Sequence, residues 1–287
     1  MHEDRSSDEL MEEAGWTIPG LLQLRCMRTP DLPALWDWLP PDGWVRTSWA
    51  EYAQAVSRLV AAFRRLGVQP GDRIGIMAPS GKHWDFAHLA ILATGAAAVG
   101  LDPHGQDEQV REIARCCDFT GLVLAQPSQL AKFDDSARQK LRFVACLAPD
   151  GDPQVLDFQF LLAEAAPEDA NWNFARPDLP ATIIFTSGTT GEPKGIEYSH
   201  RQVCLAVQGI LSAFPDVDPT HRLVCWLPLS QLFQRMINLS AIGRGAQTYY
   251  VADPRQVMQH IERIAPHLFV GVPRFYEKLY AGMQEAV

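Results

Sequence analysis

Short apolar segments alternate with amphipathic helical segments along most of this 287-residue chain. Ser48 and Glu51 form a capping-box pattern, and apolar residues then recur at helical spacing as far as Phe63. Strand-like runs lie at 73–78, 96–101, 121–125, 141–148, 181–185, 222–229, 248–252 and 268–272, and further helices are predicted at about 83–94, 106–117, 158–166, 199–214, 231–242, 254–264 and from 273 onward. Helical crossovers are what parallel strands require. The pattern predicts an α/β fold of layered, mostly parallel sheets flanked by helices.

The most polar internal stretch suggests how the chain is divided. Residues 167–180 are rich in proline and polar groups, which is typical of a boundary between folded units. We therefore expect a first α/β subdomain over 17–178 and a second one over 179–287. Residues 1–16 are acidic, and we expect them to form a disordered tail.

Composition and charge exclude several classes of protein. Lysine and arginine total 25 against 34 for aspartate and glutamate, so the formal charge is −9 and no broad basic surface for nucleic acid is expected. The longest apolar stretch, 86–101, is interrupted by polar residues and is too short to span a membrane; a peripheral membrane contact stays open. The amino terminus lacks a secretory signal and the six cysteines form no C-x-x-C pair, so a cytoplasmic location is expected.

The segment Thr186–Gly195, TSGTTGEPKG, directly follows the strand-like run 181–185. Its three glycines allow the backbone to approach a ligand closely, and its hydroxyl and amide groups can surround an anion. Lys194 adds a positive charge suited to phosphate. The spacing matches neither the Walker A loop nor the dinucleotide fingerprint. The segment predicts a polyphosphate-binding loop, and the alternative interpretation is an ordinary surface turn.

Four segments together resemble a known family. The run IIFTSGTTGEPKGIEYSH at 183–200 is similar to the phosphate-binding signature of the adenylate-forming (AMP-binding) superfamily. WLPLSQLFQR at 226–235 and VGVPRFYEKLYAGM at 270–283 resemble segments of its long-chain fatty acyl-CoA synthetases. Residues 47–96 resemble the usual upstream part, so the resemblance extends from about Thr17 to the end of the chain.

The resemblance implies an activity and a set of ligands. Enzymes of this family activate a carboxylic acid with ATP as acyl-AMP and then transfer the acyl group to a thiol, usually that of coenzyme A. It implies ATP, Mg²⁺, coenzyme A and a fatty or other hydrophobic carboxylic acid as ligands. It implies Thr186 as a ligand of Mg²⁺ and Lys194 as a catalytic counter-charge. The phosphate-binding residues it implies are Thr186, Ser187, Gly188, Thr189, Thr190, Gly191 and Lys194.

Two residues of the second segment depart from the family pattern. Gln231 stands where the long-chain branch usually has histidine, and Gln234 stands where it usually has glutamate. Glutamine forms hydrogen bonds but cannot titrate near neutral pH. Gln231 and Arg235 are candidates for contact with the substrate or for gating access to it. The alternatives are that Gln231 is a local helix cap and that Arg235 is a surface or ion-paired arginine.

Members of the family are much longer than 287 residues, and no segment after Gly271 resembles their adenine-binding or carboxy-terminal catalytic parts. The resemblance therefore implies the amino-terminal portion of such an enzyme, inactive without the carboxy-terminal portion. Two other functions stay open. One is the adenylation of an amino or aryl acid for a carrier protein, and the other is a truncated, non-catalytic binding module.

Overall fold

The computed structural model describes residues 6–164, 172–187 and 193–285. The strands are β1 (Pro33–Leu39), β2 (Gly43–Ser48), β3 (Arg73–Met77), β4 (Ala97–Gly100), β5 (Gly121–Leu124), β6 (Phe143–Cys146), β7 (Leu156–Asp157), β8 (Pro180–Ser187), β9 (Pro193–Ser199), β10 (Arg222–Cys225) and β11 (Gln247–Tyr250). The helices are α1 (Ser7–Glu13), α2 (Ile18–Arg28), α3 (Trp49–Arg65), α4 (Lys82–Ala93), α5 (Asp107–Cys117), α6 (Asp135–Arg138), α7 (Phe158–Glu164), α8 (His200–Ala213), α9 (Leu232–Arg244), α10 (Val257–Ile264) and α11 (Pro273–Glu285), with 3-10 helices η1 (Pro127–Lys132) and η2 (Pro254–Gln256).

The larger of two sheets contains the strand order β7-β6-β5-β3-β4-β8-β9 within the described residues. Its strands from β7 to β8 are parallel, and β9 alone runs antiparallel, as the partner of β8 in a hairpin. Helices connect most of the parallel strands, as the alternation in the sequence predicts, whereas β6 and β7 are joined without a helix. The predicted α/β class, with mostly parallel sheets flanked by helices, is confirmed.

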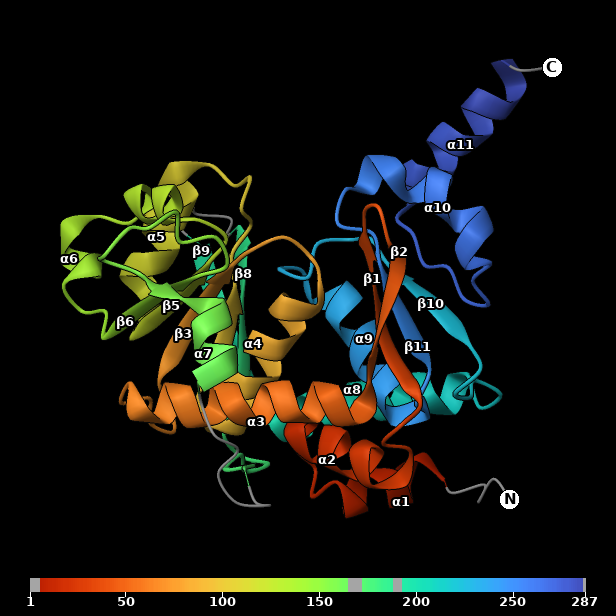
Figure 1. The fold of residues 1–287 in the computed structure, drawn as a ribbon, viewed down its shortest axis with the longest axis horizontal. Coiled ribbons are helices and arrows are strands. Elements are labelled where there is room, and N and C mark those ends of the chain that lie inside the picture. Colours follow the sequence, from red (N-terminus) through yellow and green to blue (C-terminus); the bar gives the residue numbers. More distant parts are fainter. Residues whose placement is uncertain (1–5, 165–171, 188–192, 286–287) are drawn as a thin grey trace.

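The smaller sheet has the strand order β10-β11-β1-β2. Strands β1 and β2 form a hairpin over Pro33–Ser48, which the periodicity of the sequence did not reveal. Strand β1 then pairs in parallel with β11, so that Leu35 lies opposite Thr248. The two sheets lie side by side in Figure 1, with β1 and β11 in the middle of the smaller one.

Both sheets use strands from each side of the boundary predicted at residue 178. Strands β8 and β9 follow that boundary but extend the larger sheet, whereas β1 and β2 precede it but complete the smaller sheet. The subdomain bounds 17–178 and 179–287 therefore do not coincide with the two sheets. The physical reason is that strand pairing joins segments far apart in the sequence, which a change in local composition cannot reveal.

The acidic amino terminus differs from the expected disordered tail. From Ser6 onward it forms helix α1, where the Ser6 hydroxyl accepts a hydrogen bond from the Glu9 amide over 3.2 Å and Glu9 completes the capping box. Leu10 and Met11 are buried in the main apolar core. The prediction of disorder was wrong for these residues because two apolar side chains in an acidic segment are enough to anchor a short helix.

Three predicted elements near the carboxyl half are also corrected. The strand expected over 222–229 ends at Cys225. The run 268–272 forms a single parallel bridge, between Leu223 and Leu268, rather than a strand. The last residues of the predicted phosphate loop and those after it form strand β9, where the sequence predicted no strand. Helix α11 then projects away from the rest of the chain (Figure 1).

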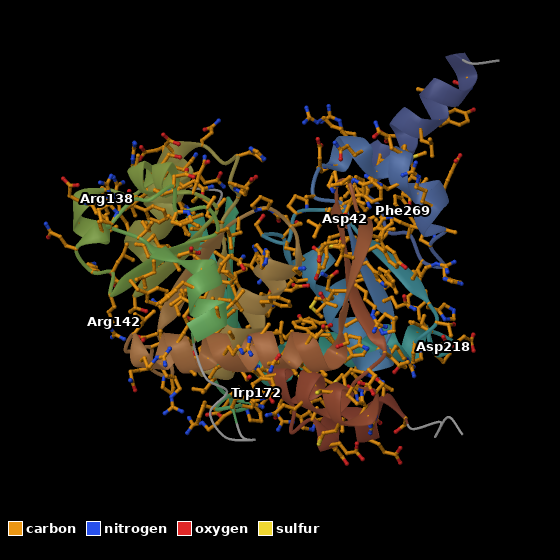
Figure 2. The ribbon with its side chains drawn as sticks, viewed as in Figure 1. Asp42, Arg138, Arg142, Trp172, Asp218 and Phe269 are labelled. Carbon is orange, nitrogen blue, oxygen red and sulfur yellow. The ribbon has the colours of Figure 1, made fainter. Side chains whose placement is uncertain are left out.

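Helix α4 is buried on every side, as expected for a helix that is apolar nearly all round. It packs on α3, which extends beneath both sheets in Figure 1. Helix α2 contacts α3, α4 and α9. It thus joins α4, which packs on the larger sheet, to α9, which packs on the smaller sheet. Figure 2 shows the side chains on this frame, with Arg138 and Asp218 at its two outer flanks. The core between the sheets is therefore continuous, and it holds the strand ends of both sheets in fixed relative positions.

Candidate functional site

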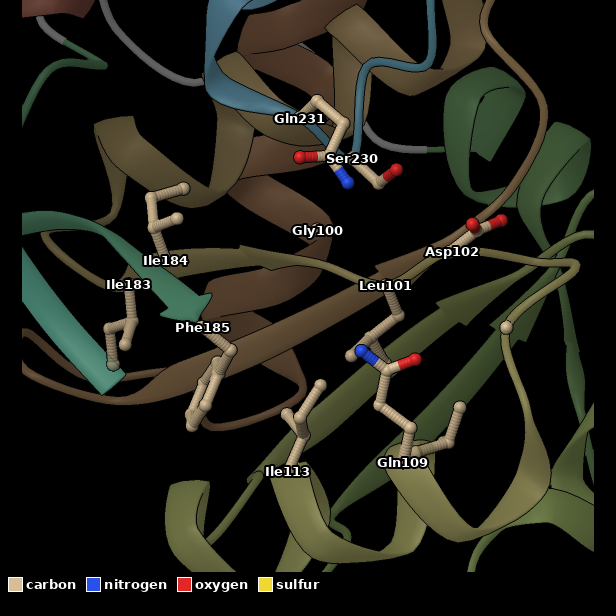
Figure 3. A pocket seen from close by; sticks show the side chains of 12 residues that line it. Gly100, Leu101, Asp102, Gln109, Ile113, Ile183, Ile184, Phe185, Ser230 and Gln231 are labelled. Carbon is tan, nitrogen blue, oxygen red and sulfur yellow. The ribbon is translucent and has the colours of Figure 1, made fainter. Parts of the chain in front are cut away.

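A small pocket opens where the parallel strands β4 and β8 end at their carboxyl side (Figure 3). Its volume is about 60 Å³. The residues that line it are Gly100, Leu101, Asp102, Gly105, Gln109, Val110, Ile113, Ile183, Ile184, Phe185, Ser230 and Gln231. Ligands of open α/β sheets usually bind outside the carboxyl ends of the strands. The fold therefore places this pocket where a ligand site is expected.

The predicted phosphate loop begins at the same strand end. Thr186 and Ser187 are the last residues of β8, directly after Phe185 of the pocket wall. Five of the loop residues, 188–192, lie outside the described residues. Lys194 lies in β9, exposed and in register with Thr186 across the hairpin. The structure thus brings together the two flanks of the loop, and the phosphate-binding and Mg²⁺-binding roles stay predictions.

Gln231 lines the pocket at the start of helix α9. It occupies the N-cap position of that helix, but its side chain makes no capping hydrogen bond. Its backbone amide donates to the carbonyl of Pro228 over 3.0 Å, which fixes the turn. In Figure 3 its side chain lies beside Ser230 and across the pocket from Gln109. The geometry thus favours a pocket-lining role for Gln231 over the alternative of a local cap.

Arg235 is buried rather than at the surface, with 1% of its area exposed. Its Nη1 donates to Thr182 Oγ1 over 2.8 Å, and its Nη2 donates to the Ser230 carbonyl over 3.4 Å. Its guanidinium also lies 5.6 Å from the centre of the Trp84 ring. Burial lowers the pKa of Arg235 to about 10, so the side chain stays charged at neutral pH. Arg235 joins β8 to the turn that carries Gln231, and its contacts are with protein groups.

A buried hydrogen-bond network surrounds this arginine. Asp85 of α4 accepts hydrogen bonds from Asn238 Nδ2 over 2.9 Å and from the hydroxyl of Tyr250. Gln234 donates to Asn238 Oδ1 over 3.1 Å and accepts from the Leu227 amide over 3.3 Å. Burial raises the pKa of Asp85 to about 6, against the opposing effect of the hydrogen bonds from Tyr250 and Asn238. The network connects α4, α9 and β11, and Gln234 serves it because an amide is both donor and acceptor.

Two residues of the pocket were missed in the sequence. The Ser230 hydroxyl is buried and makes no hydrogen bond, which is unusual for a buried polar group. A Cβ at Gly100 would lie 2.7 Å from Ser230 Cα, so only glycine allows this approach of the two backbones. The signal for Gly100 was present, because a glycine inside a strand often marks close backbone contact. No local signal singled out Ser230.

Two residues at the ends of the family-like segments are buried and have structural positions. His200 is the first residue of α8, is completely buried, and accepts at Nδ1 from the Ile18 amide over 3.4 Å. Trp226 is buried and packs against the partly buried Phe275 with ring centres 4.8 Å apart. In the described part of the chain, no three histidine, cysteine, aspartate or glutamate side chains cluster as a metal site. No described helix is long and apolar enough to cross a membrane.

Comparisons with known proteins identify the family and the fold of the chain. The sequence profile of the AMP-binding enzyme family matches residues 22–286. A long-chain-fatty-acid–CoA ligase, FadD15 of Mycobacterium bovis, is 30% identical over 249 residues, which cover 83% of this chain and 40% of that protein. The chain thus spans well under half the length of this relative.

Two solved structures show the same fold. A long-chain-fatty-acid–CoA ligase (FadD1) from Archaeoglobus fulgidus superposes with a TM-score of 0.81 at 16% identity, over 94% of this chain and 54% of that one. The anthranilate CoA ligase AuaEII in complex with anthranoyl-AMP superposes with a TM-score of 0.76 at 19% identity, over 88% of this chain and 49% of that one. At such identities the likeness establishes the fold alone, whereas the family profile covers nearly the whole sequence. The chain therefore belongs to the AMP-binding enzyme family.

Proposed function

We propose that this chain is the part of an acid–thiol ligase that binds ATP and contacts the acid. In the proposed reaction a carboxylate oxygen attacks the α-phosphorus of ATP, the bond from that phosphorus to the bridging oxygen breaks, and pyrophosphate leaves. The sulfur of coenzyme A then attacks the acyl carbon, its proton passes to solvent or a base, and AMP leaves. The observation that carries the proposal is the start of the loop Thr186–Gly195 at the carboxyl end of β8, beside a pocket.

The residues at this strand end suit the first step. The developing negative charge on the phosphates needs donors and positive charge in fixed positions. Lys194 is exposed at the end of the hairpin and opposite Thr186, so its ammonium is free to reach phosphate oxygens. Glycines and hydroxyls of the loop would supply the remaining donors. We therefore assign Thr186, Ser187, Gly188, Thr189, Thr190, Gly191 and Lys194 to the triphosphate.

Mg²⁺ fits this proposal as an ion carried mainly by the phosphates. The described residues offer no carboxylate cluster, and Mg²⁺ in such sites commonly keeps several waters and takes few protein ligands. The hydroxyl of Thr186 is the protein ligand we propose. When bound, the ion would neutralise charge on the phosphate oxygens.

The acid is proposed to be a fatty or other hydrophobic carboxylic acid. Support comes from the relative FadD15 and from the segments 226–235 and 270–283, which resemble the long-chain branch. An aryl acid is the second candidate, because the pocket beside the loop is small and the anthranilate ligase shares the fold. We place the protein in the cytoplasm as part of the same proposal.

Titration calorimetry of the 287-residue chain with Mg²⁺–ATP tests the proposal. We expect weak binding that is lost when pyrophosphate is present in excess, because both ligands need the same loop. We expect no acyl-CoA from this chain alone with palmitate or anthranilate, since its relative is more than twice as long. No detectable ATP binding at millimolar concentrations would contradict the nucleotide role and favour a non-catalytic module.

A further inference from the structure

A second, larger cavity of about 390 Å³ lies between the two sheets, and no residue lines both this cavity and the pocket beside the phosphate loop. Its volume falls in the range of sites for small organic molecules. The residues that line it are Asp37, Trp38, Leu39, Ser80, Gly81, Lys82, His83, Gln159, Tyr250, Val251, Ala252, Asp253, Gln256 and His260. They come from β1, the start of α4 and the two residues before it, α7, the end of β11 and the segment after it, η2 and α10.

One wall of the cavity is the amino-terminal end of helix α4. Four consecutive residues from Ser80 to His83 line it, and the N-cap residue is Gly81, which makes no side-chain cap. The first amide groups of a helix have no acceptor within the helix, and together with the helix dipole they favour an anion. A helix of 12 residues that lacks a side-chain cap leaves this end open to a ligand.

The opposite wall carries a buried polar group without a partner. His260 of α10 is 7% exposed, and its Nδ1 makes no hydrogen bond. Its ring lies 4.9 Å from the ring of Trp38, at an angle of 57°. Burial, with the nearby charge of Arg263, lowers the pKa of His260, so the imidazole is neutral at physiological pH. Buried polar atoms normally have partners, so this nitrogen points to a ligand.

The formal charges around the cavity cancel in pairs. Lys82 Nζ lies 3.3 Å from Asp37 Oδ2. Asp253 is paired with Arg255 over 2.8 Å and also accepts from the Arg255 amide. His83 contacts Gln159 over 3.1 Å, and burial lowers its pKa, so it is neutral as well. Asp85, the acidic residue in the first turn of α4, is hydrogen bonded to Asn238 and Tyr250 and lies near Arg235. The first amides of α4 are therefore the positive feature that faces the cavity.

We propose that this cavity binds an aromatic anion, an aryl carboxylate or aryl phosphate, with its charged group at the first turn of α4 and its ring against Trp38 and His260. The site is separate from the proposed ATP site. It touches the same framework, because the Ser80 hydroxyl donates to the Leu227 carbonyl over 3.1 Å and accepts from the Leu229 amide over 3.0 Å. That segment leads directly into Ser230 and Gln231 of the first pocket.

The test titrates the 287-residue chain with benzoate, phenyl phosphate and the neutral isostere benzamide. The readout is the indole N–H signal of Trp38 in a nitrogen–proton NMR spectrum, assigned with Trp38→Phe. We expect saturable shifts with one or both anions and at least tenfold weaker binding of benzamide. The anion with the higher affinity identifies the class of charged group.

Two variants at one position supply the matched comparison. Gly81→Asp puts a carboxylate at the N-cap, where it would occupy the amides that the ligand needs, so we expect at least tenfold weaker binding. Gly81→Ala is the control, because a Cβ there meets no atom within 4 Å and the backbone is extended, with φ of 171°. The alanine variant should bind within twofold of the original chain.

The possible outcomes of these titrations distinguish the cavity site from the proposed ATP site. Equal binding of benzamide and benzoate, or full binding by Gly81→Asp, would overturn the anion site. Lys194→Ala should leave the Trp38 shifts unchanged. If that variant abolishes anion binding while Gly81→Asp keeps it, the anion occupies the phosphate loop instead; the cavity proposal is then wrong and the ATP proposal gains support.

Discussion

Arg235 of helix α9 donates to the hydroxyl of Thr182 in strand β8 over 2.8 Å, and Thr182 in turn donates to the Ala98 carbonyl of β4 over 2.9 Å. The buried guanidinium of α9 is thereby linked to β8 directly and to β4 through Thr182, both in the larger sheet. Asp85 lies near enough to raise the pKa of this arginine against the opposing effect of burial. This connection fixes the two strand ends and the turn that together form the pocket.

Replacing the buried arginine should destabilise the chain strongly. Arg235→Ala removes the donors to Thr182 and to the Ser230 carbonyl and leaves Asp85 without its nearby positive charge. Removing one partner of a buried charged pair typically costs about 3–5 kcal/mol. Urea denaturation should show a loss of that order.

Arg255→Ala is the control for this measurement, because its ion pair with Asp253 lies at the surface and should leave the urea midpoint nearly unchanged. Equal midpoints for Arg235→Ala and the original chain would show that the buried bonds contribute little.

Asp85 should make stability depend on pH in a direction opposite to ordinary carboxylates. Burial raises its pKa from 3.8 to about 6 in the folded chain, so the folded state holds the proton more tightly than the unfolded state. Its stabilising contribution is complete below about pH 4 and is lost as the pH rises through 6. The free energy of unfolding relative to Asp85→Asn should therefore fall by up to about 3 kcal/mol between pH 4 and 7.

The comparison with Asp85→Asn is needed because other groups titrate in the same pH range. Burial lowers the pKa of His200 to about 4, so this histidine makes stability rise with pH between 4 and 6.5. That contribution is common to the original chain and to Asp85→Asn and cancels in the difference. A difference that is flat or rises across this range would contradict the raised pKa of Asp85.

Gly100→Ala should disturb the pocket through the backbone. The added Cβ would lie 2.7 Å from the Cα and 2.8 Å from the carbonyl oxygen of Ser230, so the turn before α9 has to move. Overpacking of this kind commonly costs about 1–3 kcal/mol. The expected result is a lower melting temperature by calorimetry.

Gly209→Ala is the matched control, because a Cβ there meets nothing within 4 Å and alanine favours the helix. Its melting temperature should be unchanged or higher. A Gly100→Ala chain as stable as Gly209→Ala would mean that the turn at Ser230 adapts at no cost.

Lys194→Ala should weaken ATP binding without affecting folding. The side chain is exposed in β9 and supports no core contact, so the melting temperature should not change. Loss of one charge-assisted hydrogen bond to phosphate corresponds to about 10- to 100-fold in affinity. Calorimetry with Mg²⁺–ATP measures the change.

Lys140→Ala serves as the control in that experiment, because Lys140 pairs with Asp118 at the outer flank of the larger sheet. Unchanged ATP affinity in Lys194→Ala, in a chain that does bind ATP, would remove Lys194 from the proposed site.

Local sequence determined the features that depend on neighbouring residues. The capping box at Ser48 and Glu51 defined where α3 starts, and the alternation of strands and helices indicated a mostly parallel sheet. The glycine- and hydroxyl-rich segment after β8 identified the family, because its order of residues is specific even without its geometry. These features are encoded over spans of a few to about twenty residues.

Tertiary structure decided the strand pairing and the side-chain burial, which depend on residues distant in the sequence. The hairpin of β1 and β2 belongs to the sheet of β11, some 200 residues later, and only strand pairing shows this. Arg235 could be read as a surface residue from its neighbours in sequence, whereas packing against Trp84 and Thr182 buries it. The free energy of a buried charge depends on groups that the fold brings together, and these groups lie far apart in the sequence. The sequence therefore named the candidate residues, and the fold determined which of them line the pocket and which support its walls.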